Sequence, residues 1–362
     1  MRDIRLLIIG LLLLTLSGCK KNPSNPPVVT PVGDGWFVVT PESQGMDSRI
    51  LSQGFDQADQ AGFIDGLLVI RNGLIVAEDY FNGYDSSTTH NVMSVSKSFL
   101  SAITGLAFRE GYLDSLNQLV LPYFPECIDP GMDPRKYSIT IRHLLTMRMG
   151  LDHEQTNYSV LYNSDNWVAA TLAHPFVAAP GEEFHYNTFG THLLSALITK
   201  AIDTTTRAFG ETHLFEPLGI TVDAWEQDPQ GYYFGGNSMH FTPREMAKFG
   251  LLYMNNGRKG DVQIVPADWV SYTLSPSTDF DNGTWGPVTN MNYARLWWLG
   301  TLNGYRAFMG IGHGGQFVIC IPSLNMVVVS TSNNHVNWNT ADAQERAVLE
   351  IVSTYVLGSL KD

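Results

Sequence analysis

Ser94 and Lys97 stand three residues apart and could act as a nucleophile and its base. A serine hydroxyl is a weak nucleophile at neutral pH and needs a neighbouring group to accept its proton. Residues three apart share one face of a helix, so the Lys97 amine can reach the Ser94 oxygen. Burial would lower the pKa of Lys97 and leave a neutral amine that accepts this proton. Since Ser17 and Lys20 have the same spacing by chance, the rest of the chain must decide whether the pair is catalytic.

Residues 180–190 form a second candidate for chemistry. A Pro-Gly turn leads to Tyr186, which has polar neighbours and precedes an apolar run with helical spacing. A tyrosine has a pKa of about 10 in water, so it acts as a base only where a cation such as a lysine lowers that value. The alternative interpretation is a tyrosine that packs at the start of a helix.

A third candidate is the glycine-rich run over residues 310–316, which comes directly before a predicted strand. The run matches the pattern G-x-G-x-x-G, but a dinucleotide-binding loop follows a strand and opens a helix. We therefore expect an edge strand without bulky side chains, against whose backbone a substrate can lie. A glycine-rich bulge is the alternative.

Strand patterns occur at both ends of the chain. Residues 66–80 read as two strands joined at Asn72-Gly73, a dipeptide that favours a tight hairpin. Residues 317–321 and 326–329 predict another hairpin near the C-terminus. Strands early and late, with helices between them, predict an α+β fold. We expect a central antiparallel sheet flanked by helices and built from both chain ends, with a mainly helical inserted domain.

The predicted boundaries follow from these patterns. The sheet domain comprises residues 37–108 and 241–362, and residues 109–240 form the helical insertion. Inside the insertion, helical patterns occupy residues 141–151 and 189–202.

Two helix starts matter for the argument. Apolar residues recur at helical spacing after Ser94, which places Ser94 at a helix N-terminus. Backbone N–H groups and the helix dipole at such a position help to stabilise a developing negative charge. At the C-terminal end, residues 341–357 carry an apolar helical stripe, and Thr340 is the expected N-cap.

The N-terminus has the composition of an export signal. An apolar run over residues 6–16 follows two arginines and is too short to span a bilayer. The run ends in Leu-Ser-Gly-Cys19, which resembles the lipobox of bacterial lipoproteins. This resemblance implies that residues 1–18 are a signal peptide and that Cys19 is acylated, and residues 19–36 read as a tether. We expect an exported lipoprotein in the cell envelope, on the periplasmic face of a membrane or at the cell surface, although an ordinary secretory signal is the alternative.

Composition excludes some classes of function. The net charge of −13 argues against nucleic-acid binding, which favours a basic surface. His153-Glu154 begins like the zinc motif H-E-x-x-H, but Asn157 replaces its second histidine, and we expect neither a metal nor a cofactor. Cys127 and Cys320 could pair in an oxidising compartment, although free buried cysteines are the favoured interpretation.

The three candidate segments occur in the order and rough spacing of the motifs of the serine β-lactamase-related hydrolases. They are Ser94-x-x-Lys97, Tyr186-Asn187-Thr188 and His313-Gly314-Gly315. This family includes class C β-lactamases, D-alanyl-D-alanine carboxypeptidases, family VIII-type esterases and 6-aminohexanoate-dimer hydrolases. The resemblance covers about residues 37–358, and residues 40–46 and 81–84 look most like the 6-aminohexanoate-dimer hydrolase branch.

The resemblance implies a role for each motif residue. Ser94 would be the acylated nucleophile and Lys97 its base or proton relay, while Tyr186 would share the proton transfer and protonate the leaving group. The backbone N–H groups of Ser94 and Gln316 would form the oxyanion hole. Whether Lys97 or Tyr186 is the base stays open.

Two departures from the family pattern concern the substrate-binding positions, which the resemblance places at Thr188, His313 and Gly315. Thr188 stands at the third place of Tyr-x-Asn, and its hydroxyl lacks the paired donor and acceptor of an amide. His313 replaces the lysine of Lys-Thr-Gly and is mostly neutral at pH 7, so the fixed cation that attracts a β-lactam carboxylate is lost. Both departures argue against a β-lactam substrate.

The leading hypothesis is a serine hydrolase that cleaves small ester or amide bonds through an acyl-enzyme on Ser94. A D-amino-acid carboxypeptidase or β-lactamase acting on cell-wall peptides or β-lactams is the alternative. A non-catalytic, penicillin-sensing lipoprotein is a third hypothesis, whose hallmark would be loss of a motif residue. No G-x-S-x-G segment occurs, which removes the usual signature of α/β-hydrolases.

Overall fold

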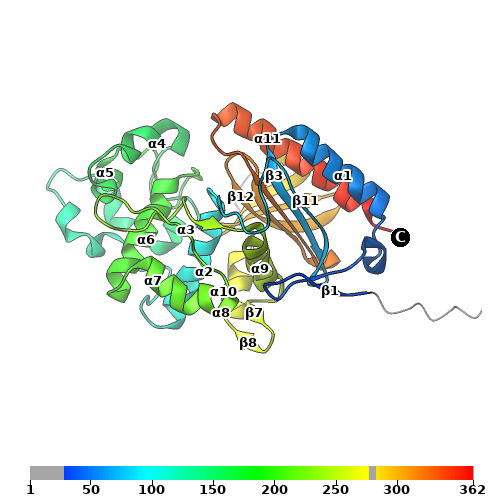
Figure 1. The fold of residues 1–362 in the computed structure, drawn as a ribbon. Coiled ribbons are helices and arrows are strands. Elements are labelled where there is room, and N and C mark those ends of the chain that lie inside the picture. The colour runs from blue at the N-terminus through cyan, green and yellow to red at the C-terminus, as the bar shows by residue number, and fades with distance from the viewer. Residues whose placement is uncertain (1–27, 277–282, 362) are drawn as a thin grey trace, which may run out of the picture.

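The computed structural model describes residues 28–276 and 283–361, which form a ten-stranded sheet with helices on both faces (Figure 1). In their order across the sheet, the strands are β1 (Thr30–Pro31), β2 (Phe37–Val38), β4 (Leu74–Tyr80), β3 (Ile64–Arg71), β14 (Met326–Ser332), β13 (Gln316–Ile321), β12 (Tyr305–Gly312), β11 (Trp298–Leu302), β10 (Val288–Tyr293) and β9 (Gly283–Trp285). Neighbouring strands are antiparallel except β2 and β4, which are parallel. The pairing of β3 with β14 joins the two ends of the chain, as the sequence predicts.

Both predicted hairpins are present. The turn between β3 and β4 consists of Asn72 and Gly73, whose φ angles are 53° and 76°. A two-residue turn in the left-handed region matches the twist of the flanking strands, which is why Asn-Gly is favoured there. The turn between β13 and β14 ends at Asn325, which also has a positive φ of 46°.

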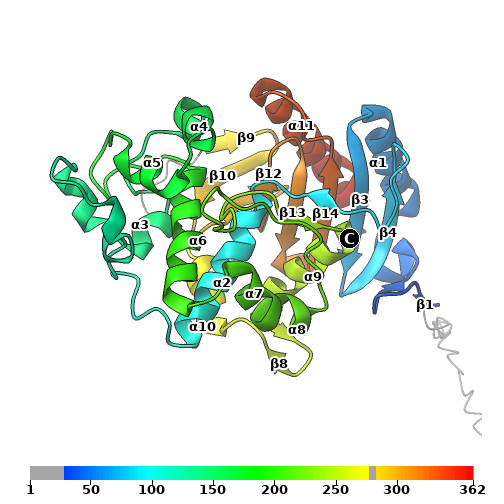
Figure 2. The ribbon, with the colours of Figure 1, turned by 60° about the vertical axis from the view of Figure 1, so that its left-hand side comes forward.

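The helices are distributed over the two faces of the sheet and a separate helical region. They are α1 (Ser48–Ala61), α2 (Val95–Arg109), α3 (Ile141–Leu145), α4 (Glu154–Tyr162), α5 (Trp167–Ala173), α6 (Thr188–Ile202), α7 (Thr206–Gly210), α8 (Glu216–Leu218), α9 (Pro243–Met254), α10 (Ala267–Thr273) and α11 (Trp338–Ile351). Helices α1 and α11 lie side by side on one face of the sheet, and α2 and α9 lie on the other (Figures 1 and 2).

Strand β3 shows how the sheet is held between these layers. Leu67 and Val69 pack with residues of α1 and α11, while Leu68 and Ile70 point to the opposite face and pack with α2 and α9. All four side chains are buried. Because both faces of the strand are covered here, residues 67–70 form a continuous apolar run that does not alternate.

Two short pairs of strands lie outside the main sheet. The pair β7 (Arg258–Lys259) and β8 (Val262–Gln263) forms a hairpin after α9. The pair β5 (His90–Asn91) and β6 (His240–Phe241) joins the segment before Ser94 to the segment that follows the helical region. This second pair fixes the start of α2 against the far end of the insertion.

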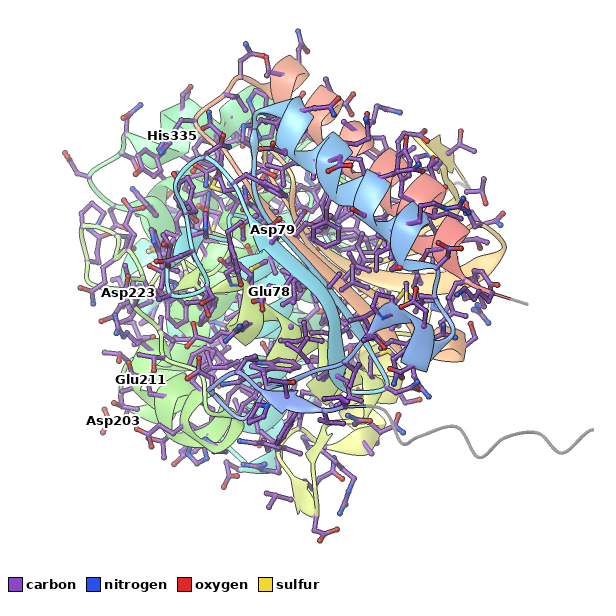
Figure 3. The ribbon with its side chains drawn as sticks, turned by 45° about the vertical axis from the view of Figure 1, so that its right-hand side comes forward. Glu78, Asp79, Asp203, Glu211, Asp223 and His335 are labelled. Carbon is purple, nitrogen blue, oxygen red and sulfur yellow. The ribbon has the colours of Figure 1, made fainter. Side chains whose placement is uncertain are left out.

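Arg244 on α9 and Glu78 on β4 form a bidentate ion pair between a helix and the sheet, and Figure 3 labels Glu78 on its strand. The guanidinium donates from Nε and Nη2 to the two carboxylate oxygens, each over 2.7 Å. Both side chains are only 11% exposed, so solvent screens the pair weakly. The pair therefore holds α9 in a defined position against β4.

Two predicted helix boundaries are wrong. Helix α3 ends at Leu145, because Met147 has a φ of 57° that stops the helical path well before residue 151. Helix α11 begins at Trp338, and its N-cap is Asn337. The Asn337 side chain accepts the backbone N–H of Thr340 over 3.0 Å, so Thr340 lies inside the first turn.

The predicted signal peptide, the acylated Cys19 and the first part of the tether lie outside the described residues and stay predictions. The last part of the predicted tether is ordered, because Thr30 and Pro31 pair with β2, and Trp36 is 5% exposed in the core. Cys127 and Cys320 are both free. Over residues 28–276 and 283–361, no helix has the length and apolar character needed to cross a membrane.

Phe99 on α2 lies two residues after Lys97 and packs in an aromatic cluster. Its ring stacks on Phe249 with 3.8 Å between centroids and on Phe241 with 4.5 Å. The side chain is fully buried. This cluster anchors α2 to α9 and to the segment after the insertion.

We expect Phe99→Ala to lower the free energy of unfolding by about 3–5 kcal/mol, because it removes buried apolar surface and leaves a cavity. Urea denaturation followed by circular dichroism measures this change. The control is Val160→Ala, at a side chain that is 63% exposed, for which the expected change is below about 0.5 kcal/mol. Equal stability of the two variants would show that the cluster does not anchor α2.

Candidate active site

Ser94 stands at the N-terminus of α2, directly after a strained turn. Met93 has a φ of 50°, an unusual conformation for a residue other than glycine, and its N–H donates to Asn91 Oδ1 over 2.9 Å. The preceding residue, Val92, donates its N–H to Met239 O over 2.9 Å. These bonds hold the turn so that the Ser94 side chain lines a cavity. Backbone strain that the surroundings hold in place is common at functional sites.

Lys97 lies one turn further along α2 and is 1% exposed. Its Nζ contacts the Ser94 Oγ at 2.8 Å, so the i, i+3 spacing brings the two residues together as predicted. The amine also donates to Thr188 Oγ1 and to Gly236 O, each over 2.9 Å. Burial lowers the pKa of Lys97 to about 8, against the opposing effect of the Glu154 carboxylate.

Gly236 lets the backbone approach Lys97 closely. A Cβ atom at this position would lie 2.4 Å from Thr191 Oγ1 and 3.2 Å from Lys97 Cε. Only glycine therefore brings a carbonyl group within hydrogen-bonding distance of the buried amine. The sequence offered no sign of this role, because Gly236 belongs to no motif.

Tyr186 lies beside the pair, with its ring centroid 4.9 Å from Lys97 Nζ. The ring stacks on Trp298 at 5.7 Å and meets Tyr293 edge-on at 5.8 Å. Burial and the Glu154 carboxylate raise the pKa of Tyr186 well above its ordinary value, and hydrogen bonding to Ser94 offsets this only in part. Lys97 is therefore the group that loses its proton more readily.

Thr188 is the first residue of α6, and its hydroxyl lies between Lys97 and Glu154. Glu154 Oε2 accepts the Thr188 backbone N–H over 3.0 Å and also the Thr188 hydroxyl proton. Asn187, the middle residue of the motif, is the N-cap of α6 and accepts the Phe189 N–H over 2.9 Å. Its role is thus structural.

Glu154 is the functional candidate that sequence reasoning missed. The sequence singles out Glu154 only as part of an incomplete zinc motif with His153. In the structure it begins α4, is 4% exposed, and donates its backbone N–H to Tyr186 O over 2.9 Å. A single glutamate in the helical insertion carries no pattern that indicates burial beside Lys97.

The third motif is a turn and does not form an edge strand. His313, Gly314 and Gly315 connect β12 to β13, and β12 itself lies between β11 and β13. Gly314 and Gly315 have φ angles of 83° and 106°, which explains why glycine occupies both positions. The expected open strand edge is present only at residues 310–312, which belong to β12 and extend past β11, and the expectation is wrong for residues 313–315, which form the turn.

Gln316, expected in the oxyanion hole, is fully buried and pairs with Gly312 across the hairpin. Its side-chain amide donates to Ser332 O over 2.6 Å, away from the cavity-lining residues. Gly315 packs against Ser332, where an added Cβ would lie 2.9 Å from the hydroxyl oxygen. The structure therefore brings neither Gln316 nor Gly315 to Ser94.

Ile311 on β12 has the backbone donor that faces the cavity. Strand β11 begins at Trp298, opposite Met309, so residues 310–312 extend beyond it. The Gly312 carbonyl accepts the Gly315 N–H over 3.2 Å on the β13 side. Because hydrogen-bonding direction alternates along a strand, the Ile311 N–H points to the uncovered side, and Ile311 lines the cavity together with Ser94.

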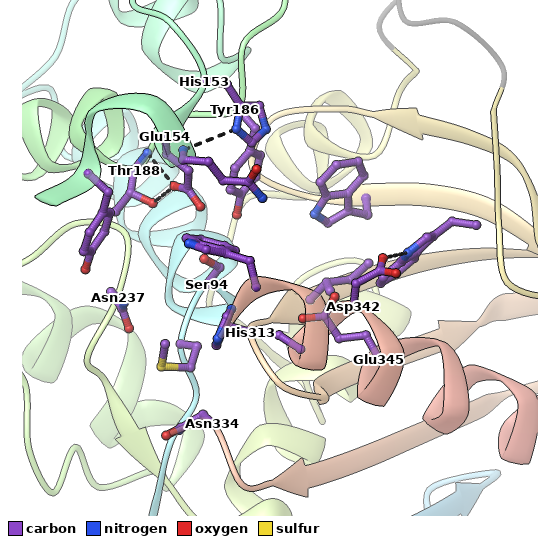
Figure 4. Close-up of a pocket in the computed structure, with 18 of the residues that line it drawn as sticks. Ser94, His153, Glu154, Tyr186, Thr188, Asn237, His313, Asn334, Asp342 and Glu345 are labelled. Carbon is purple, nitrogen blue, oxygen red and sulfur yellow. Dashed lines mark hydrogen bonds between the residues drawn. The ribbon is translucent and has the colours of Figure 1, made fainter. Parts of the chain in front are cut away.

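The cavity has a volume of about 840 Å³ and is walled by aromatic side chains (Figure 4). The aromatic residues are Tyr158, Phe184, Tyr186, Trp285, Trp298 and Trp338. Asp342 and Glu345 project from α11 on the side opposite Glu154 and Thr188. An apolar wall with a few convergent polar groups is typical of sites that bind small organic molecules.

His313 and the two carboxyl groups of α11 define the far wall. His313 lines the cavity, its Nε2 lies 2.9 Å from Val336 O, and its ring meets Trp338 edge-on. Glu345 accepts the Gly314 N–H over 3.0 Å, and burial raises its pKa to about 8. Asp342 is exposed and accepts from Arg346 over 2.8 Å.

Comparisons with known proteins identify the family. The model of the Beta-lactamase family matches residues 55–353. The 6-aminohexanoate-dimer hydrolase of Paenarthrobacter ureafaciens is 25% identical over 289 residues, covering 74% of this chain and 72% of the relative.

Solved structures show the same fold. A putative 6-aminohexanoate-dimer hydrolase from Bacillus anthracis aligns with a TM-score of 0.66 and 22% identity, over 85% of this chain and 82% of that one. A D-stereospecific amidohydrolase from Streptomyces sp. aligns with a TM-score of 0.63 and 15% identity, over 85% and 98% of the two chains. The predicted resemblance is confirmed, and the chain belongs to the Beta-lactamase family of serine hydrolases, which includes amide hydrolases.

Proposed function

We propose that this protein hydrolyses small ester or amide bonds through an acyl-enzyme on Ser94. The observation that carries the proposal is the contact of 2.8 Å between the Ser94 hydroxyl and the buried Lys97 amine. A lysine whose pKa is lowered to about 8 is partly neutral at physiological pH and accepts a proton from a neighbouring hydroxyl.

Acylation uses the groups around Ser94 in turn. Neutral Lys97 takes the Ser94 proton while Oγ attacks the substrate carbonyl carbon. The oxyanion that forms accepts hydrogen bonds from the N–H groups of Ser94 and Ile311. Tyr186 retains its phenol proton, gives it to the departing oxygen or nitrogen, and regains a proton from the Lys97 ammonium.

Deacylation follows the same path in reverse. A water molecule takes the place of the leaving group and passes a proton toward Lys97 as its oxygen attacks the acyl carbon. The second oxyanion uses the same two N–H groups. Ser94 then departs with a proton returned from Lys97, and the carboxylic acid product leaves.

The walls of the cavity favour neutral acyl chains. Asp342 on α11 and Glu154 near the reacting atoms place carboxylates at the cavity, whereas Glu345, whose pKa burial raises to about 8, is mostly neutral at pH 7. Like charges in a partly desolvated cavity repel, so a substrate carboxylate is disfavoured there. Aromatic side chains such as Trp298 and Trp338 offer apolar contact instead.

Ser94→Ala should reduce ester hydrolysis at least about a thousandfold and abolish labelling by a fluorophosphonate probe, because it removes the acylated oxygen. Initial rates with nitrophenyl acetate and gel fluorescence of the probe measure both effects. The matched control is Ser98→Ala on the same helix, whose hydroxyl donates to Leu296 O and away from the site. Ester turnover that survives Ser94→Ala would exclude Ser94 as nucleophile.

The kcat/KM for nitrophenyl acetate should rise with pH through about 8, where the buried Lys97 loses its proton, and then level off. The sign follows from the chemistry, because the protonated amine below this pH cannot accept the Ser94 proton. Rates corrected for spontaneous hydrolysis give the profile. Lys97→Met should lack this rise, and a wild-type profile that is flat between about pH 6 and about pH 9 would contradict the proposal.

Nitrophenyl valerate should be cleaved at least about tenfold faster than mono-nitrophenyl glutarate, which has a similar chain ending in a carboxylate. At pH 7, Asp342→Asn should narrow this ratio, since it removes a carboxylate from the cavity wall. Comparing kcat/KM of the two esters for both proteins tests the effect. Efficient hydrolysis of the anionic ester, or of the β-lactam nitrocefin, would favour the β-lactamase alternative.

A further inference from the structure

The protonation state of Lys97 decides which of its three hydrogen-bond partners can pass a proton to it. As an ammonium, Lys97 has three N–H groups for its three partners, which are Ser94 Oγ, Thr188 Oγ1 and Gly236 O. As a neutral amine it has two N–H groups and one lone pair. Only the partner that faces the lone pair can pass its proton to Lys97, so catalysis requires that this partner be Ser94.

Gly236 is excluded from the lone pair by its chemistry. A carbonyl oxygen has no proton and always accepts. Ser94 and Thr188 both carry hydroxyl groups, and a hydroxyl can donate or accept. If Thr188 donated to the amine, the lone pair would be occupied and Ser94 would keep its proton.

Glu154 removes this ambiguity. Its Oε2 accepts the Thr188 backbone N–H over 3.0 Å and lies within hydrogen-bonding distance of the Thr188 hydroxyl. The Thr188 hydroxyl donates to this oxygen, and a carboxylate oxygen has no proton to give in return. Glu154 is 4% exposed and Thr188 2% exposed, so these bonds are largely shielded from water.

We propose that Glu154 is a positioning residue that acts through Thr188 and directs the lone pair of neutral Lys97 at the Ser94 hydroxyl. The inference rests on the proposed function of Ser94 and Lys97. It also explains the departure from the Tyr-x-Asn pattern. An asparagine oxygen accepts from the lysine without help, whereas Thr188 becomes an obligate acceptor only because its proton is committed to Glu154.

The titratable groups facing Lys97 are Glu154, from the start of α4, and Tyr186, from the segment before α6. Glu154 raises the pKa of Lys97, while burial lowers it. Removing the charge of Glu154 therefore has two separable effects. It disorients the lone pair, which slows acylation, and it moves the rise in the pH profile to lower pH.

The test is Glu154→Gln, whose amide nitrogen can donate to Thr188 Oγ1 and turn its proton toward Lys97. The rate of Ser94 labelling by a fluorophosphonate, and kcat with nitrophenyl acetate, should fall roughly tenfold to a hundredfold. KM should change little, and the rise in the pH profile should shift to lower pH. The control is Glu226→Gln, whose carboxylate accepts from Tyr162 at the other end of α4 and which should leave the rate unchanged.

A rescue experiment distinguishes a misdirected lone pair of Lys97 from a general loss of structure in Glu154→Gln. Adding Thr188→Asn to Glu154→Gln should restore most of the labelling rate, because an amide oxygen accepts from Lys97 whatever stands at position 154. Thr188→Val provides a second test with Glu154 in place. It should slow labelling and leave the rise in the pH profile unshifted, since the charge remains.

Each outcome bears on a different claim. Wild-type labelling with an equal rate in Glu154→Gln, or in Thr188→Val, would overturn the inference and leave the proposed function standing. A slow Glu154→Gln protein with a native unfolding temperature and no rescue by Thr188→Asn would also overturn it. Absence of labelling in the wild type would overturn the proposed function, and the inference with it.

Discussion

The burial of one lysine amine is the constraint on which the site depends. An ammonium group away from water is unfavourable unless polar partners surround it, and the same desolvation makes the neutral amine accessible near neutral pH. Lys97 meets three partners, which come from α2, from the start of α6 and from the loop containing Gly236. Parts of the chain that are far apart in sequence must therefore converge on one nitrogen, and the helical region is held to the sheet at this point.

The sheet supplies the complementary half of the site. Strand β12 extends past the end of β11, which leaves backbone groups of residues 310–312 without a strand partner on that side. Gly312 lets this segment approach the turn before α2, since a Cβ there would lie 2.4 Å from Val92 O. The nucleophile at a helix start and a donor at an open strand edge thus face the same cavity. Both are fixed by backbone geometry, so they need little reorganisation when charge develops on the substrate.

The sequence correctly predicted the features that depend on a local pattern of residues. The spacing of Ser94 and Lys97 places them together on any helix, and Asn72-Gly73 has few conformations other than a hairpin turn. The predictions were wrong where contacts with distant parts of the chain decide which of two nearby residues takes a role. The glycines after His313 form a turn, which moves the backbone donor from Gln316 to Ile311 on the preceding strand. Likewise, Asn337 competes with Thr340 for the helix cap, and no local rule ranks them.

Glu154 was beyond sequence reasoning for a different reason, because its importance comes only from burial beside Lys97 and Thr188. Its position also resolves a conflict. A carboxylate in direct contact with Lys97 would hold it as an ammonium, since opposite charges in a poorly solvated site attract strongly. The Thr188 hydroxyl stands between the two groups and transmits the orientation while keeping the negative charge one hydrogen bond further away. Lys97 therefore retains a pKa of about 8 and gains a directed lone pair. The substitution of asparagine by threonine is tolerable in this site only because a buried carboxylate accompanies it.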